Sequence, residues 1–316
     1  MMQAFLDIAD YDTATLTQII RDGMAMKANP DDHLSRLAGK SIALIFEKPS
    51  TRTRVSFEVG VYQLGASPVV LDSKSMQLGR GETIADTARA LSRYVDAIMI
   101  RANSHAALVE LAKHAEIPVI NGLTDRSHPC QVMADVMTLA EYKAPDLDFS
   151  HLSVLWTGDG NNVAHSWIEA SARFGFALTL ATPASMRPDE GIVTNALKEG
   201  GRITLADDAF AAAKGVDLIV TDTWASMGST ADVDKSAHDD ILTPFRVTSA
   251  LMKQAASDAI FMHCLPVYRG NEVVAEVVDG PQSVIWDEAE NRLHVQKAIM
   301  CHCMDIGVGQ DRGVSR

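Results

Sequence analysis

The chain has 316 residues, of which 47% are hydrophobic and 22% are charged, and this balance is typical of globular proteins rather than disordered ones. A chain of this length predicts two domains, each with its own hydrophobic core. The net charge of −13 repels polyanions at long range, so we expect neither nucleic acid nor a membrane as a partner.

The amino terminus, MMQAFLDIADYD, carries acidic residues and lacks the basic flank of a signal peptide. No apolar run reaches the length that spans a membrane. The four cysteines have no framework-like spacing, and Cys301-His302-Cys303 matches no common zinc pattern. We therefore expect a cytoplasmic protein with reduced cysteines and with neither a metal nor another cofactor.

In the first half of the chain, short apolar runs alternate with longer stretches of helical period. The runs predict strands at residues 41–46, 68–71, 97–100 and 118–120. The stretches between and after them predict helices at residues 51–64, 82–94, 105–115 and 129–142. This alternation is typical of a parallel sheet covered by helices on both faces.

The second half repeats the rhythm, with strands predicted at residues 153–156, 177–181, 202–206, 217–221, 259–263 and 284–286. Thr243 followed by Pro244 is typical of a helix start and predicts a helix that continues toward Ala255. The sequence therefore predicts an α/β fold of two doubly wound parallel-sheet domains.

Between the halves, the acidic and proline-containing segment KAPDLDFSHL interrupts the helical period. We place one domain at residues 1–145 and the other at residues 146–287. The segment DEAENRLHVQKAIM then has helical period and predicts a C-terminal helix at residues 288–305. Residues 306–316 lack periodicity, so we expect them to form a flexible tail.

The segment FEKPSTRTRVSFE leaves the first predicted strand and enters a helix. Ser50 can cap that helix and leave backbone N–H groups of its first turn free for an anion. The hydroxyls of Thr51 and Thr53 and the guanidinium of Arg52 add donors that suit phosphate oxygens. Taken alone, the segment fits an ordinary cap followed by surface arginines equally well.

Three further polar residues follow the next strands of the first half, namely Arg101, His128 and Gln131. In doubly wound sheets, ligands collect beyond the carboxyl ends of the strands. Each residue alone could be structural, as a strand-end charge or as part of a helix start. Their combination with the Ser50 segment favours a site for an anion or for a polarised carbonyl group.

In the second half, TDTWASMG places Asp222, Ser226 and Met227 after a strand. The acid could hold an ammonium group and the hydroxyl an amino-acid head group, although a hydrogen-bonded turn is the common alternative. HCLPVYRG places Cys264 after the next strand, where the thiol either lines the site or is buried and inert.

The segment WTGDGNNVAHSW joins a strand to a helix through glycines, as a dinucleotide-binding loop does. It lacks the third glycine of that motif, so the dinucleotide interpretation is weak. The adjacent amides of Asn161 and Asn162 favour a small polar ligand instead, and a simple turn is the alternative.

Taken together, these segments resemble the aspartate/ornithine carbamoyltransferase family over nearly the whole chain. STRT and HPCQ resemble segments shared across the family, and DTWASMG and HCLP resemble its ornithine branch. After HCLP, the continuation VYRGNEV departs from the small-residue-His-Arg-Gly continuation that is usual there. The resemblance implies transfer of the carbamoyl group of carbamoyl phosphate to the side-chain amine of L-ornithine, which gives L-citrulline and phosphate.

The resemblance also implies a role for each matching residue. Carbamoyl phosphate would be held by Ser50, Thr51, Arg52, Thr53, Gln77, Arg101, His128, Gln131, Cys264, Leu265 and Arg292. Ornithine would be held by Asn162, Asp222, Ser226 and Met227. Among these, the residues implied in catalysis are Arg101, His128, Asp222 and Cys264. Gln77 would reach the site of a neighbouring subunit, which implies a homotrimer or a multiple of trimers.

The resemblance further implies that the C-terminal helix packs back on the first domain, and it favours arginine biosynthesis over arginine breakdown. Alternatives from the same class are putrescine, aspartate or an acylated ornithine as the carbamoyl acceptor. Alternatives from other classes are an NAD-dependent oxidoreductase built on GDGNN and a non-catalytic amino-acid sensor.

Overall fold

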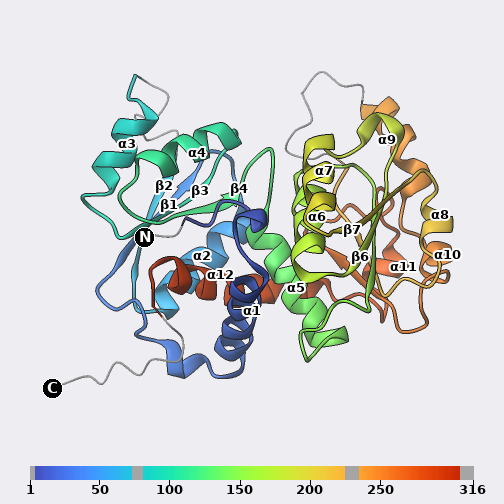
Figure 1. Ribbon diagram of the computed structural model, residues 1–316, viewed down its shortest axis with the longest axis horizontal. Helices are drawn as coiled ribbons and strands as arrows, with labels where there is room; N and C mark the ends of the chain where they lie inside the picture. Colours follow the sequence, from blue (N-terminus) through green and yellow to red (C-terminus); the bar gives the residue numbers. More distant parts are fainter. Residues whose placement is uncertain (1–3, 73–80, 225–234, 307–316) are drawn as a thin grey trace.

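The structure, a computed structural model, describes residues 4–72, 81–224 and 235–306. Its two halves each contain a parallel sheet, and a group of helices lies between them (Figure 1). Two parallel-sheet α/β domains are the fold class that the sequence predicts. Within the described residues, no helix combines the length and the apolar character that crossing a membrane requires.

The first sheet has the strand order β2-β1-β3-β4, and all of its pairings are parallel. Its strands are β1 (Ser41–Phe46), β2 (Ser67–Asp72), β3 (Ala97–Arg101) and β4 (Val119–Leu123). The helices of this half are α1 (Thr13–Ala28), α2 (Thr51–Gln63), α3 (Ile84–Leu91), α4 (His105–His114) and α5 (Pro129–Lys143), with short 3-10 turns at Ile8–Asp10 and Pro30–His33.

Side chains of β1 alternate between two cores, as expected for a strand covered on both faces. Ile42 and Leu44 belong to the large core that includes buried residues of α1, α2 and α5. Ala43 and Ile45 belong to the smaller core beneath α3 and α4. Burial on both faces explains why this strand has a continuous apolar sequence instead of an alternating one.

The second sheet has the order β7-β6-β5-β8-β9 and is also parallel throughout. Its strands are β5 (Ser153–Thr157), β6 (Ala177–Ala181), β7 (Arg202–Ala206), β8 (Leu218–Thr221) and β9 (Ile260–His263). The helices of this half are α6 (Asn162–Phe174), α7 (Glu190–Lys198), α8 (Ala209–Ala212), α9 (Lys235–Leu242), α10 (Ser249–Met252) and α11 (Ala275–Val278), with 3-10 turns at Ala184–Met186 and Thr243–Phe245.

The C-terminal helix α12 (Ile285–Cys303) leaves the second half and packs against α1, α2 and α5 of the first (Figure 1). Gly23 allows the close approach of α1, because a Cβ at this position would lie 3.3 Å from the Cα of Val295. Almost every residue of α5 is buried between α12 and the second half. The return of the C-terminal helix to the first domain, implied by the family resemblance, is therefore correct.

Two predicted elements are wrong. Residues 284–286 do not form a strand, because α12 already begins at Ile285 and Ser283 makes only an isolated bridge with Phe261. A short apolar run at the start of a buried helix resembles a strand in sequence, and periodicity cannot separate the two.

The helix predicted from Thr243 to Ala255 is also interrupted. Its first part is the 3-10 turn Thr243–Phe245, after which Arg246 is extended and Val247 pairs with the backbone of Glu272. The helix α10 then starts anew under a cap by Thr248. Phe245 and Val247 are buried in the outer core of the second half, and this burial outweighs the helix-starting signal.

Candidate active site

The two sheets direct the carboxyl ends of their strands toward one cavity of about 150 Å³. In each sheet the strand order reverses beside the first strand, between β1 and β3 and between β5 and β8, and such reversal points are where α/β sheets bind ligands. The described residues that line the cavity are Ser50, Arg52, Thr53, Arg101, Leu123, His128, Asn162, Val163, Asp222, Thr223, Cys264, Leu265, Pro266, Tyr268 and Arg292.

The loop after β1 forms one wall of the cavity. Ser50 caps α2, and its hydroxyl accepts the backbone N–H of Thr53 at 3.3 Å. The hydroxyl of Thr53 accepts from Arg101 Nη1 at 3.4 Å and from Arg292 Nη2 at 2.7 Å. One buried hydroxyl therefore holds two guanidinium groups that come from β3 and α12.

Arg52, Arg101 and Arg292 create a strongly cationic environment at this wall. Burial, together with the positive charges of Arg292 and Arg52, lowers the pKa of Arg101 to about 10. The pKa of Arg292 is also lowered, mainly by burial. Cations that are forced together in a buried place are stabilised when an anion binds between them.

His128 is buried at the start of α5, and its backbone N–H donates to the hydroxyl of Ser166 at 2.9 Å. Burial holds the pKa of its imidazole well below the ordinary value, and the charges of Arg292, Arg101 and Arg52 act in the same direction. The ring is therefore neutral at physiological pH. A neutral imidazole can donate a hydrogen bond to a carbonyl oxygen without bringing a further charge to the site.

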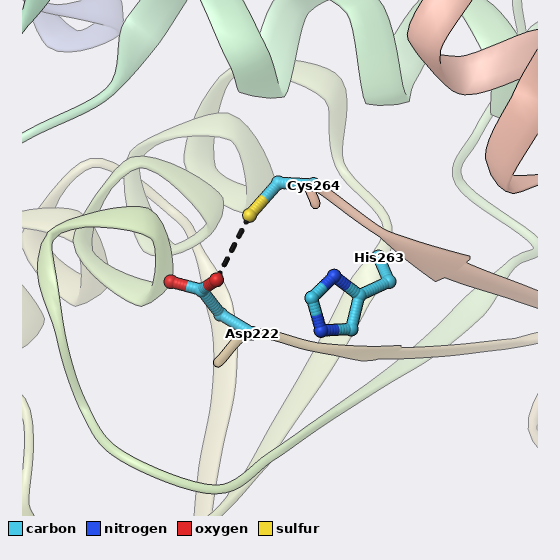
Figure 2. A group of neighbouring side chains, drawn as sticks. All are labelled: Asp222, His263 and Cys264. Carbon is cyan, nitrogen blue, oxygen red and sulfur yellow. Dashed lines mark hydrogen bonds between the residues drawn. The ribbon is translucent and has the colours of Figure 1, made fainter. Parts of the chain in front are cut away.

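Asp222, at the end of β8, lies on the opposite side of the cavity. Its carboxylate accepts from three neutral groups: the thiol of Cys264 at 3.0 Å, the backbone N–H of Thr223 at 2.7 Å and the amide of Asn161 at 2.8 Å. Figure 2 shows the thiol of Cys264 directed at this carboxylate. The negative charge is held in place by neutral donors and stays available to a cationic ligand.

The possible metal ligands Asp222, His263 and Cys264 lie with their donor atoms within 4.8 Å of one another (Figure 2). Both ring nitrogens of His263 are nevertheless engaged. Nδ1 accepts the backbone N–H of Leu265 at 2.9 Å, and Nε2 lies 3.2 Å from a carboxylate oxygen of Glu272. Since the thiol also donates to Asp222, the group is a hydrogen-bonded network rather than an open set of ligands.

The loop after β5 does not have the geometry of a dinucleotide site. The side chain of Asn161 accepts the N–H groups of Val163 and Ala164, and these are donors that a pyrophosphate would need. Gly160 lies against the backbone near Pro188, and a Cβ there would be 2.3 Å from the nitrogen of Pro188. The structure thus adds a second reason, besides the missing third glycine, against a dinucleotide site.

Comparison with known proteins identifies both halves of the chain. Residues 3–141 match the carbamoyl-P binding domain of aspartate/ornithine carbamoyltransferase, and residues 150–303 match the Asp/Orn binding domain. The chain belongs to the aspartate/ornithine carbamoyltransferase family.

Relatives within this family cover nearly the full chain. The chain is similar to the ornithine carbamoyltransferase of Nitrobacter winogradskyi, with 54% identity over 96% of this chain and 97% of the relative. It is 46% identical to the solved ornithine carbamoyltransferase of Pyrococcus furiosus, with a TM-score of 0.88 and coverage of 95% and 96%. The solved anabolic ornithine carbamoyltransferase of Campylobacter jejuni has 36% identity, a TM-score of 0.89 and coverage of 96% and 99%.

Most of the residues that the family resemblance implies lie together at this cavity. Thr51 is at the same helix start, but its side chain is exposed and lines a neighbouring hollow. Gln131 is buried behind the cavity wall instead of lining it. The predicted positions Gln77, Ser226 and Met227 fall outside the described residues.

Asn162 lines the cavity, and its side-chain amide donates to the backbone carbonyl of Thr124 at 2.7 Å. The bond joins the start of α6 to the loop that precedes α5. Asn162 therefore forms a hydrogen bond between the two halves of the protein and also lines the cavity.

Sequence reasoning missed several residues of the site. Tyr268 and Thr223 line the cavity, and Asp135 and Glu288 surround Gln131 behind it. The spacing of Gln131 and Asp135, four residues apart on one helix, could have indicated that the two side chains meet. No local signal connects them to Glu288, which lies 157 residues away from Gln131 in the sequence.

Proposed function

We propose that the protein is an ornithine carbamoyltransferase, which transfers the carbamoyl group of carbamoyl phosphate to the side-chain amine of L-ornithine. The observation that carries this proposal is the division of one cavity into an arginine-lined end and a carboxylate end. A dianionic phosphate fits the first end, and an amino acid with a cationic amine fits the second. The family membership supports the same activity.

At the arginine-lined end, Ser50, Thr51, Arg52 and Thr53 hold the phosphate of carbamoyl phosphate. The backbone N–H groups at the start of α2 and the guanidinium of Arg52 offset its charge. The carbamoyl group is bound by Arg101, His128, Gln131, Cys264, Leu265 and Arg292. Gln77 contributes from a neighbouring subunit, so the active unit is a homotrimer or a multiple of trimers.

At the carboxylate end, Asp222 and Asn162 bind ornithine together with Ser226 and Met227. Asp222 attracts the ammonium form of the ligand, whereas the attacking amine must be neutral. One proton therefore leaves the amine after binding. Asp222 and Cys264 orient the nitrogen, and the phosphate of the substrate is the base that accepts this proton.

The reaction itself needs no enzyme nucleophile and no metal, because carbamoyl phosphate is already activated. The amine attacks the carbamoyl carbon, the C–N bond forms, and the C–O bond to phosphate then breaks. Thr53, Arg101 and His128 stabilise the oxyanion of the tetrahedral intermediate, and positioned donors of this kind are typically worth about two to three orders of magnitude in turnover each.

We infer a cytoplasmic enzyme that works in arginine biosynthesis rather than in arginine breakdown. The solved Campylobacter jejuni relative, described as anabolic, supports this direction. We also propose the domain boundary between residues 145 and 146, which lies in the gap between the two family matches, residues 3–141 and 150–303.

The phosphate assignment is tested by two arginine variants on the same helix. Arg52 lines the cavity, whereas Arg54 is exposed and pairs with Glu58 at 2.7 Å. In calorimetric titrations with carbamoyl phosphate, Arg52→Ala should weaken binding about 30-fold to 1,000-fold. Arg54→Ala should bind within about twofold of the wild type. Near-wild-type binding by Arg52→Ala contradicts the assignment.

The acceptor is tested with a panel of amines at saturating carbamoyl phosphate. L-Ornithine should give citrulline with the highest kcat/KM, and putrescine, aspartate and an acylated ornithine should each react at least tenfold less efficiently. A preference for putrescine or an acylated ornithine would keep the carbamoyl transfer and overturn the acceptor. Absence of product with every amine would favour the sensor alternative.

A further inference from the structure

Behind the carbamoyl end of the cavity lies a buried group of three side chains, Gln131, Asp135 and Glu288. Each is at most 1% exposed. Gln131 and Asp135 are one turn apart on α5, and Glu288 is in the first turn of α12. The amide nitrogen of Gln131 donates to Asp135 Oδ1 at 2.8 Å and to Glu288 Oε1 at 3.1 Å.

Glu288 also connects this group to the second sheet. Its other oxygen, Oε2, accepts the backbone N–H of His263 at 2.8 Å. His263 is the last residue of β9 and directly precedes Cys264 and Leu265, which line the cavity. One carboxyl group thus joins α12, α5 and the end of β9.

The two carboxyl groups determine which way the amide of Gln131 faces. Carboxylate oxygens accept hydrogen bonds, so two of them hold the NH₂ side of the amide. The carbonyl oxygen of Gln131 must then face away from both, and it is buried without a hydrogen-bond partner in the described residues. A buried acceptor in this state is stabilised when a ligand N–H binds to it.

The hydrogen bonds also indicate where a proton belongs. Both oxygens of Glu288 accept N–H groups, and Oδ1 of Asp135 accepts from Gln131. Oδ2 of Asp135 is buried and receives no donor from the described residues. The two carboxyl groups are also hydrogen-bonded to each other, so one of them carries a proton. Both oxygens of Glu288 already accept N–H groups, which leaves this proton to Oδ2 of Asp135, and it prevents two adjacent buried carboxylates from both being ionised.

We propose that Asp135 and Glu288 are positioning residues that share one proton and fix the amide of Gln131 behind the cavity wall, so that its carbonyl oxygen accepts from the carbamoyl NH₂ group when the ligand binds. This inference rests on the proposed carbamoyl phosphate site and adds the two residues that set its orientation. Burial raises the pKa of both carboxyl groups, that of Asp135 to about 7. The other titratable groups that act on the pair are Arg292 of α12, Asp222 after β8 and Cys264 after β9.

The proposal predicts that the two acids respond differently to amide substitution. In Asp135→Asn, the new NH₂ group replaces the shared proton and the remaining oxygen still accepts from Gln131, so every bond is kept. In Glu288→Gln, one oxygen must serve two N–H donors, and the new NH₂ group faces one of them. Either Gln131 or the backbone of His263 then loses its partner.

Two stable ligands separate this effect from phosphate binding. Phosphonoacetamide carries both a phosphonate and a carboxamide, and methylphosphonate lacks the carboxamide. In titrations of the full chain, Glu288→Gln and Asp135→Ala should weaken phosphonoacetamide about 10-fold to 100-fold, the usual effect of losing a residue that orients a ligand group. Both should bind methylphosphonate like the wild type, and Asp135→Asn should restore phosphonoacetamide to within about threefold.

Equal phosphonoacetamide affinity in Asp135→Ala and the wild type, or equal losses in Asp135→Ala and Asp135→Asn, would overturn the proposal. If the wild type binds neither ligand, the proposed phosphate site fails instead.

The unsubstituted protein provides a further test that does not depend on folding of a variant. Because the pKa of Asp135 is raised to about 7 and that of Glu288 is raised as well, the pair loses protons as the pH rises past about 7, so the affinity ratio of phosphonoacetamide to methylphosphonate should fall. A constant ratio between pH 6 and 9 also contradicts the proposal.

Discussion

The two ends of the cavity carry opposite charges. At the end formed by the first sheet and α12, Arg101 and Arg292 donate to the hydroxyl of Thr53, Arg52 also lines the cavity, and burial lowers the pKa of Arg101 and Arg292. At the end formed by the second sheet, the described residues that donate to the carboxylate of Asp222 are all neutral. The first end holds several positive charges, which a bound anion neutralises. The second end holds one negative charge.

This difference explains how a single cavity can orient two ligands. A dianion is drawn to the three arginines, and a cationic amine is drawn to Asp222 at the other end, so neither ligand is favoured in the place of the other. The neutral His128 lines the same cavity, near enough to the three arginines to have its pKa lowered by them, and adds no charge of its own. Substitutions that alter one end should therefore affect one ligand much more than the other.

The largest loss is expected at the cationic end. Arg101→Met keeps much of the volume of the side chain and removes its charge, so the oxyanion of the intermediate loses a donor. We expect kcat to fall by about two to three orders of magnitude. Arg93→Met is a matched control, because Arg93 is exposed and pairs with Glu116 at 3.2 Å. A steady-state assay in which Arg101→Met keeps more than a tenth of the activity would remove Arg101 from catalysis.

At the opposite end, Asp222→Asn should mainly affect the acceptor. The substitution removes the negative charge and leaves the shape, so we expect the KM for ornithine to rise about 30-fold or more. Methylphosphonate binding should change less than threefold, because the three arginines are untouched. Comparable losses for both ligands would show that the two ends do not act separately.

A smaller effect is expected from the thiol that holds Asp222. Cys264→Ser keeps a donor at this position, whereas Cys264→Ala removes it, so the alanine variant should have an ornithine KM about three-fold to tenfold higher than the serine variant.

Burial raises the pKa of the Cys264 thiol well above its ordinary value of 9.0, and Asp222 raises it further. The thiol therefore stays protonated below pH 9, and its alkylation by iodoacetamide should be slow from pH 7 to 9. Rapid alkylation in this range would contradict a thiol that stays protonated.

The sequence predicted local structure well and distant contacts poorly. The strand at residues 177–181 has the predicted bounds, and Ser50 caps α2 as expected, because these features depend on neighbouring residues. The bond between Arg292 and Thr53 joins residues that are 239 positions apart, and no local pattern indicates it. Only the family resemblance connected Arg292 to the Ser50 segment.

Burial explains the elements that the sequence predicted incorrectly. The apolar run at residues 284–286 is the buried start of α12, and the break after Phe245 places two apolar side chains in the outer core. In both places tertiary contacts override a local signal, which single-sequence patterns cannot reveal.

The smallest expected effect on activity concerns the loop that carries Leu265 to the cavity. Glu272 is buried, and its Oε1 accepts the backbone N–H of Tyr268 at 2.5 Å and lies 3.2 Å from the ring of His263. Glu272→Gln keeps one acceptor oxygen but brings an NH₂ group into this buried network, which should cost about 1–3 kcal/mol of the free energy of unfolding.

Because Leu265 has a positive φ of 61° and its N–H donates to His263, the loop depends on the same network. We therefore expect the KM for carbamoyl phosphate to rise no more than about threefold in Glu272→Gln, while its denaturation midpoint falls clearly. Glu276→Gln is the control, since Glu276 is exposed on α11 and should change neither quantity. Urea denaturation with parallel kinetics measures both, and an unchanged midpoint in Glu272→Gln would mean that the loop is held by its backbone contacts alone.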